Sequence, residues 1–159
     1  MNDIELTDLQ TVQIDQLISL MNDQKVRKHL PLLDQNFSVA SCREFLKSKE
    51  ALWAQHGYGP WAFVIQNQFA GWGGLQPEHG EADFALVLHP KFWGWGRRIF
   101  DKIKAQAFGP MNLQTITALL PTSRSNARAI TRLGFVEQDQ LTINQVDFTR
   151  YRYCRAASD

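Results

Sequence analysis

Hydrophobic positions in the first third of the chain recur at the spacing of helices. Apolar side chains at positions 14, 17, 18 and 21 fall on one face of a helix. A short helix follows and is expected to end near Pro31, which lacks the N–H needed to continue it. Residues 37–59 predict a longer helix with Ser38 as its N-cap and a glycine-rich exit. After a short strand at residues 4–9, this part of the chain is therefore predicted to be mainly helical.

From Trp61 the pattern becomes that of extended strands. Residues 61–66 and 69–76 are rich in aromatic and β-branched side chains and flank an Asn-Gln pair, which is typical of a hairpin. Residues 82–89 form a third apolar run after the turn-rich segment 77–81. Three consecutive strands are the simplest prediction.

The last third of the chain alternates between the two kinds of pattern. Ile99, Ile103 and Ala107 stand at helical spacing directly after a strand. The elements expected are a helix at 97–108, a buried strand at 114–121, a short helix at 126–135 ended by Gly134, and closing strands at 140–143 and 146–153. This order of strands, helix, strand, helix and strands predicts a mixed α/β fold.

Composition limits the class of protein. A chain of 159 residues with 44% hydrophobic and 21% charged residues suits one compact domain spanning residues 1–159. The balance of 17 basic against 16 acidic residues favours neither nucleic acid nor an anionic membrane as partner. Because the chain shows no secretion signal pattern and no run of ~18 apolar residues, a cytoplasmic protein is expected. Cys42 and Cys154 lack metal-ligand spacing, so no metal is expected, and both are predicted to be reduced, buried thiols.

The segment HPKFWGWGRRIF, residues 89–100, carries the candidate chemistry. Its glycines lie at a strand-to-helix turn, where they allow a ligand to approach the backbone and the first helical N–H groups have no internal partner. With the helix dipole and the neighbouring Arg97 and Arg98, these donors favour a phosphate or pyrophosphate. A purely structural corner packed with aromatics is an equal alternative from these residues alone. The nucleotide-binding patterns GxxxxGK[ST] and GxGxxG are both absent.

A longer stretch resembles a known family. DFALVLHPKFWGWGRRIFDKIKAQAF, followed by TITALLP and then ITRLGF, resembles the Gcn5-related N-acetyltransferases (GNAT), especially the branch of ribosomal-protein N-terminal acetyltransferases. The resemblance extends from Trp61 to Phe148. It implies a twisted, largely antiparallel sheet with helices on both faces, in which two central parallel strands splay apart and hold acetyl-CoA.

The resemblance also implies which residues hold acetyl-CoA. Main-chain atoms near Val87 and Leu88 would pair with the pantetheine arm, and an N–H there would polarise the thioester carbonyl. Asn126 is a further candidate, displaced by one turn from the family position at Ser123. The pyrophosphate would be wrapped by a six-residue turn whose members are Trp93, Gly94, Trp95, Gly96, Arg97 and Arg98. Arg98 replaces a small residue of the family pattern and is expected to bind phosphate, with a solvated surface position as the alternative.

The catalytic groups follow the family pattern less closely. Asp83 has the position of the carboxylate that begins the branch's central strand and is the candidate base, acting through water, while Glu81 shares its side of the strand. The alternative is that these acids solvate a strand end or bind a cationic substrate. His79 is a secondary candidate for proton transfer. Ile130 occupies the position at which many relatives have a tyrosine that acts as general acid. Tyr151 and Tyr153 are replacements only if their strand faces the site.

Together these residues predict direct acetyl transfer from acetyl-CoA to a primary amine, on a protein N-terminus or a small molecule. The five tryptophans leave two other functions open: a binding module for a peptide or sugar with an aromatic cleft, and an acyl-CoA sensor without activity. Trp72, beside several glycines, is a candidate wall of such a cleft or a site of close packing. The closing strand is compatible with a monomer or a homodimer.

Overall fold

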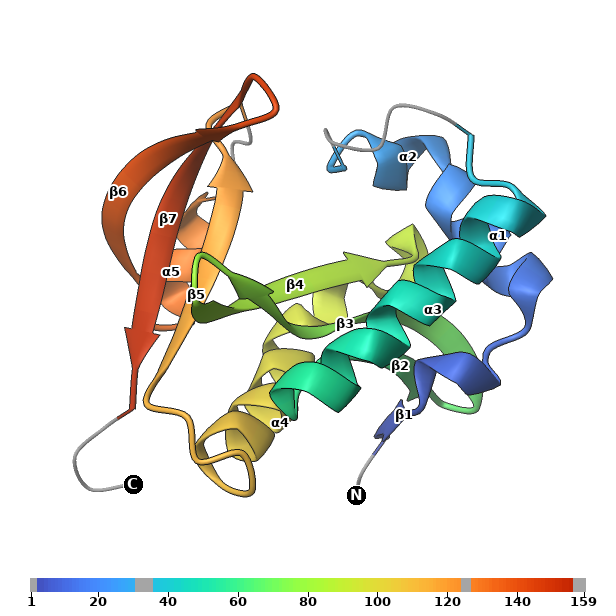
Figure 1. Ribbon diagram of the computed structural model, residues 1–159, viewed down its shortest axis with the longest axis horizontal. Coiled ribbons are helices and arrows are strands. Elements are labelled where there is room, and N and C mark those ends of the chain that lie inside the picture. Colours follow the sequence, from blue (N-terminus) through green and yellow to red (C-terminus); the bar gives the residue numbers. More distant parts are fainter. Residues whose placement is uncertain (1–2, 31–35, 124–126, 156–159) are drawn as a thin grey trace.

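The computed structural model describes residues 3–30, 36–123 and 127–155. Its centre is a seven-stranded sheet in the order β1-β2-β3-β4-β5-β7-β6 (Figure 1). The strands are β1 (Ile4–Thr7), β2 (Pro60–Ile65), β3 (Gln68–Glu78), β4 (Glu81–Leu88), β5 (Thr115–Pro121), β6 (Val136–Ile143) and β7 (Val146–Cys154). Neighbouring strands are antiparallel except β4 and β5, which run parallel. The predicted mixed α/β sheet is confirmed.

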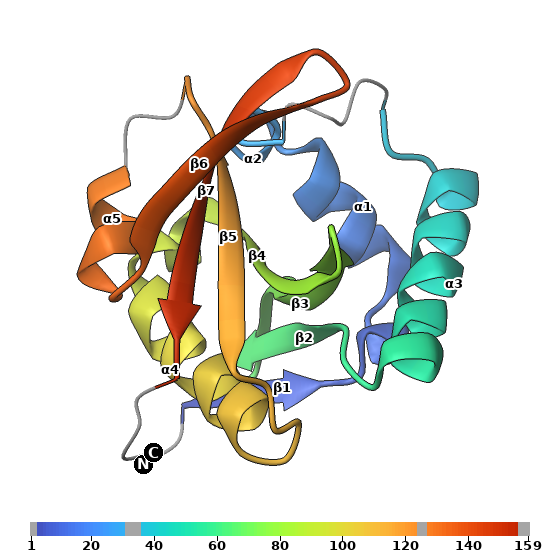
Figure 2. The same cartoon turned by 60° about the vertical axis from the view of Figure 1, so that its left-hand side comes forward.

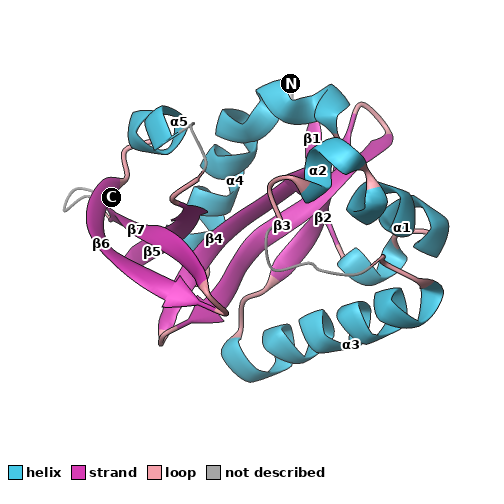
Figure 3. Cartoon of the chain, turned by 90° about the horizontal axis from the view of Figure 1, so that it is seen from above, coloured by secondary structure: helices cyan, strands magenta, loops and turns pink. Residues whose placement is uncertain are grey.

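Helices cover both faces of this sheet, as the view from above shows (Figure 3). The helical elements are η1 (Leu9–Thr11), α1 (Ile14–Asn22), α2 (Gln24–Arg27), α3 (Val39–His56), η2 (Pro90–Trp95), α4 (Gly96–Phe108) and α5 (Ala127–Arg132). Buried residues of α1, α2 and α3 pack with Ala62, Trp72 and Val87, and we call this side the α3 face. Helices α4 and α5 pack on the opposite side, the α4 face.

Local signals explain where the longest helix and the first hairpin end. The Ser38 side chain accepts a hydrogen bond from the Ser41 N–H and caps α3, which ends at Gly57 in the left-handed conformation. Strands β2 and β3 are joined through Gln66 and Asn67, which both have positive φ, as the tight turn of a hairpin requires. The hairpin is therefore confirmed, with its turn one residue earlier than predicted.

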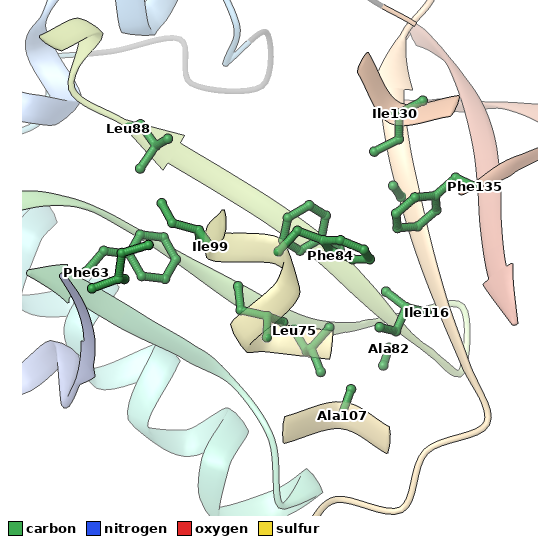
Figure 4. Close-up of a cluster of buried hydrophobic side chains, with 14 of the residues drawn as sticks. Phe63, Leu75, Ala82, Phe84, Leu88, Ile99, Ala107, Ile116, Ile130 and Phe135 are labelled. Carbon is green, nitrogen blue, oxygen red and sulfur yellow. The ribbon is translucent and has the colours of Figure 1, made fainter. Parts of the chain in front are cut away.

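The α4 face holds a continuous aromatic and aliphatic core (Figure 4). Phe84 of β4 lies 5.0 Å from Phe100 of α4 and 6.3 Å from Phe135, measured between ring centroids. Ile99 and Ile103 of α4 are fully buried in the same cluster. This core ties β4 to the segment after α5, on the side of the sheet opposite α3.

Strands β4 and β5 separate after a single point of pairing. Their register contains the Asp83–Thr117 pair, and beyond it the two strands diverge (Figure 2). We call the diverging segments, residues 84–88 of β4 and 118–121 of β5, the strand fork. The predicted splaying of the two central parallel strands is therefore present.

Two expectations need correction. Cys42 is buried, but Cys154 is exposed at the end of the closing strand, so the prediction of two buried thiols is wrong for Cys154. Strand β6 begins at Val136, four residues before the predicted start. The prediction missed these residues because the first half of the strand is exposed and shows no alternation of apolar and polar residues. Within the described ranges, none of the helices has the length and apolar character needed to cross a bilayer.

Candidate active site

The backbone of β4 presents hydrogen-bonding groups to the strand fork. The carbonyl oxygens of Ala85 and Val87 are directed at β3, where a Cβ on Gly73 or Gly71 would lie only 2.3 or 2.1 Å from them. The glycines near Trp72 thus serve close packing of the strands. Because successive residues of a strand turn their backbone groups to opposite edges, those of Leu86 and Leu88 face the fork. Val87 and Leu88 were both expected beside the pantetheine arm. The backbone N–H and C=O groups of Leu88 point to the fork, and those of Val87 point to β3.

The turn between β4 and α4 contains two glycines, Gly94 and Gly96, that neither a positive φ nor close packing requires. Gly96 has φ −56° and ψ −41°, an ordinary helical conformation, and Gly94 is not among the residues with positive φ. A Cβ on Gly94 would meet no atom within 4 Å, and one on Gly96 would make only an ordinary 3.8 Å contact with Leu86. The backbone of both glycines is therefore accessible to a ligand. These positions fit a pyrophosphate that approaches the backbone directly.

The charges around this turn also favour an anion. Trp95, the N-cap of α4, provides no side-chain acceptor for the first N–H groups, and no acidic residue lies in the first turn. Arg97 and Arg98 are exposed in that turn. The Arg98 guanidinium lies over the Trp95 ring, 4.6 Å from its centroid. This stacking holds Arg98 beside the open N-terminus of α4.

Trp93 connects the turn to the fork. Its indole N–H donates a hydrogen bond of 2.9 Å to the carbonyl of Leu88, and its ring lies edge-on to His29 at 5.6 Å. Nearly half of the Trp93 side chain remains exposed. Trp93 therefore contacts a carbonyl that faces the fork, and it fixes the turn against the end of β4.

Asp83 lies buried where the fork begins. Only 7% of the residue is exposed, and Thr117 Oγ1 donates a 2.9 Å hydrogen bond to its Oδ1. Burial raises the pKa of Asp83 to about 7, Glu78 and Glu81 add to the rise, and the Thr117 hydrogen bond and the charge of Arg150 oppose it. The carboxyl group thus changes its charge near neutral pH, in the range suited to a general base.

Glu81 lies on the same side of β4 but is engaged by arginines. Both of its carboxylate oxygens accept hydrogen bonds from Arg152, at 2.7 and 2.6 Å, and Arg150 lies 4.0 Å away. Arg150 also pairs with Asp139 at 3.2 Å. Since Glu81 is held in this network, Asp83 is the better placed of the two candidate bases.

The remaining candidates lie elsewhere or outside the described residues. Tyr151 and Tyr153 pack into the α4-face core, away from Asp83, and the Tyr153 hydroxyl accepts a hydrogen bond from Lys104. Ile130 is buried in the same core. His79 is exposed in the β3–β4 turn, 3.7 Å from Glu78. Asn126 lies outside the described residues, and Ser123 is exposed after β5.

Several residues near Asp83 had no assignment in the sequence. Thr117 is a polar residue flanked by the apolar Ile116 and Ala118 at a buried position of β5, which is the available signal for a partner. Arg150 and Arg152 alternate with Tyr151 and Tyr153, and this period of two marks one polar face of β7. None of these signals indicates that the partners are Asp83 and Glu81, from a strand more than thirty residues away.

A family model described as acetyltransferase (GNAT) domain matches residues 3–136, which is more than half of the chain. The chain belongs to the GNAT acetyltransferase family. It is thus an acyltransferase with acetyl-CoA as its acetyl donor, and the family that the sequence resembles is confirmed. A comparison with curated proteins found no significant match.

Solved structures of low sequence identity share the fold. An acetyltransferase (GNAT family) from Bacillus anthracis is 14% identical with a TM-score of 0.78, and the match covers 96% of this chain and 95% of that one. An acetyltransferase from Agrobacterium tumefaciens is 16% identical, with a TM-score of 0.78 and coverage of 96% and 91%. Spermidine N-acetyltransferase from Vibrio cholerae, in complex with CoA and spermine, is 17% identical, with a TM-score of 0.71 and coverage of 96% and 95%.

Proposed function

We propose that this GNAT protein transfers the acetyl group of acetyl-CoA directly to a primary amine, with Asp83 as general base. The observation that carries the proposal is the buried carboxyl group at the start of the strand fork, with a pKa of about 7. An amine attacks only when it has lost a proton, so a base that is deprotonated near neutral pH is required beside the acyl group. Asp83 satisfies this requirement among the described residues of the α3 face.

The transfer balances without a covalent enzyme intermediate. The amine nitrogen attacks the thioester carbon, the C–N bond forms, the C–S bond breaks and CoA leaves as the thiolate. The proton lost from the nitrogen passes through water to the Asp83 carboxylate. Thr117 holds that carboxylate in place through its 2.9 Å hydrogen bond. The developing negative charge on the carbonyl oxygen would be stabilised by a backbone N–H of β4 that faces the fork.

The acetyl donor is assigned to the fork and the turn that follows it. The pantetheine arm would lie along β4 near Val87 and Leu88, where the outward backbone groups are those of Leu86 and Leu88. The pyrophosphate would lie against the turn whose residues are Trp93, Gly94, Trp95, Gly96, Arg97 and Arg98. The open space at Gly94 and Gly96 and the two arginines support this assignment.

Two classes of acceptor have support. The likeness of the WGWG turn to the ribosomal-protein branch supports a protein N-terminus. The likeness in fold to a spermidine N-acetyltransferase supports a small-molecule amine. A thiol-release assay with acetyl-CoA and a panel of spermidine, an alkylamine, an amino acid and a peptide with a free N-terminus distinguishes them.

The same assay tests Asp83. Asp83→Asn is expected to lower kcat by about 10²- to 10⁴-fold, the usual contribution of general base catalysis. The exposed Asp101→Asn on α4 is the matched control and should leave kcat unchanged. If none of these amines releases thiol while CoA still binds, the proposed transfer to a primary amine is wrong.

A further inference from the structure

Lys49 of α3 directs its ammonium group inward, onto the α3 face of the sheet. Its Nζ donates a 2.5 Å hydrogen bond to Gln76 Oε1 of β3. The same atom lies 5.2 Å from the centroid of the Phe45 ring and 5.4 Å from that of the Trp72 ring. The two rings meet edge to face at 4.8 Å. We call Phe45, Trp72 and Gln76 the ammonium site.

The inward position of the Lys49 ammonium group is unusual for a lysine near the surface. No Asp or Glu in the described parts of the chain forms an ion pair with Lys49, and burial lowers its pKa. A lysine near a surface normally extends its charge into water. The inward position of Lys49 therefore indicates that aromatic faces and an amide oxygen favour an ammonium ion here.

A hollow next to α3 offers the Lys49 side chain an alternative position. Beside α3 lies a hollow of about 310 Å³, lined by Lys49 together with the carboxylate residues Asp8 and Glu50 and the rings of Trp53 and Trp61. The Lys49 ammonium lies in the ammonium site although these acids border the hollow. When another cation takes the ammonium site, the hollow can receive the displaced side chain.

The ammonium site lies next to the candidate base. Gln76 is directly opposite Asp83 in the register of β3 and β4, and Trp72 is opposite Val87. Directly opposed residues of two antiparallel strands have side chains in contact range on one face of the sheet. The Gln76 side chain and the Asp83 carboxyl group therefore lie on the same face of the sheet, at directly opposed positions of β3 and β4.

We propose that the ammonium site binds the acceptor, a primary ammonium on an unbranched aliphatic chain, and that Lys49 occupies this site in the free enzyme as an internal competitor. The proposal rests on the acetyl transfer proposed above. The site contains one amide oxygen and two rings but no carboxylate, which suits a single ammonium group on an alkyl stem. An alkylamine and a lysine side chain both present this chemistry, whereas a peptide N-terminus does not.

The test compares Lys49→Met with the wild type. Methionine keeps an apolar stem and removes the charge, so the site is vacated without opening a large cavity. We expect the Kd for n-butylamine, measured without acetyl-CoA by tryptophan fluorescence, to fall about tenfold, because a site filled nine-tenths of the time by a competitor binds tenfold more weakly. The KM for n-butylamine should fall by the same factor. Neutral n-butanol should not bind.

Three further variants sharpen this result. Lys49→Arg keeps a cation in place and should leave the Kd unchanged, as should Lys47→Met, which removes an exposed lysine of the same helix. Phe45→Leu in the Lys49→Met background should weaken n-butylamine binding several-fold, because it removes one ring face. An unchanged or higher Kd in Lys49→Met overturns the proposal.

The source of the ammonium and the transferase activity are tested separately. A peptide with an internal lysine and a blocked N-terminus is expected to compete with n-butylamine, and a lysine-free peptide with a free N-terminus is not. Competition by the second peptide alone overturns the assignment to an alkyl ammonium. Tighter amine binding in Lys49→Met without any thiol release would support the ammonium site and contradict the acetyl transfer.

Discussion

Asp83 is subject to opposing electrostatic effects from its surroundings. Burial and the nearby Glu78 and Glu81 favour its protonated form, while the Thr117 hydroxyl and Arg150 favour the carboxylate. Burial is the largest of these effects and brings the pKa to about 7. A group that is useful as a base near neutral pH therefore weakens the fold whenever it is charged.

This cost predicts how stability changes with pH. Between about pH 4 and pH 7 the unfolded chain has released the Asp83 proton and the native state still holds it, so the free energy of unfolding falls as pH rises through this window. Above pH 7 the loss is complete. Asp83→Asn lacks this titration and is expected to gain on the order of 4 kcal/mol over the wild type between pH 4 and pH 8.

Urea unfolding of both proteins at pH 4 and pH 8 measures this gain. Asparagine keeps an oxygen that accepts the Thr117 hydrogen bond, so the comparison isolates the charge. Asp101→Asn, at an exposed position on α4, serves as the control and should show no gain that depends on pH. The same difference between Asp83→Asn and the wild type at both pH values would contradict the burial of a titrating carboxyl group.

At the scale of elements, a substitution in the turn from β4 into α4 is expected to affect stability and ligand binding in opposite directions. Gly96 already has helical dihedral angles, and its Cβ would make only a van der Waals contact. Gly96→Ala is therefore expected to raise the free energy of unfolding by about 0.4–1 kcal/mol, since alanine restricts the unfolded chain. The added methyl group should raise the KM for acetyl-CoA about tenfold or more by occupying the space assigned to the pyrophosphate.

Thermal unfolding and a titration of acetyl-CoA check the two effects in one variant. Gln106→Ala, at an exposed position near the other end of α4, is the matched control and should leave the KM unchanged. Loss of stability in Gly96→Ala would show that the glycine serves the fold. An unchanged KM would place the pyrophosphate elsewhere.

At the scale of the molecule, the two parts of the sheet that meet at Asp83 and Thr117 form opposite sides of the proposed donor site. A ligand that binds between them stabilises only the folded protein. CoA at 100 times its Kd is expected to raise the free energy of unfolding by about 2.7 kcal/mol and the Tm by about 5–10 °C. ADP, which carries a pyrophosphate without pantetheine, should give a smaller shift. No shift with CoA at millimolar concentration would contradict binding at the fork.

The sequence by itself determined the elements and the family. Period and end signals such as Ser38 and Gly57 act within a few residues, so helices, hairpin and the order of elements followed from local patterns. The WGWG turn followed for the same reason, because its glycines and arginines are contiguous. The predicted start of β6 was too late, and the predicted burial of Cys154 was wrong. Both errors concern exposed segments, which lack such a pattern.

Only the tertiary structure decided which side chains meet. Thr117 and Asp83 are 34 residues apart, Lys49 and Gln76 are 27 apart, and Arg152 and Glu81 are 71 apart. These contacts depend on strand register, and a slip of one residue would turn Asp83, Thr117, Gln76, Arg152 or Glu81 to the opposite face of the sheet. Burial, which raises the pKa of Asp83, is likewise a property of the packed molecule. The sequence therefore identified Asp83 as a candidate, and the tertiary structure added its partner Thr117, its pKa near neutrality and the opposed Gln76.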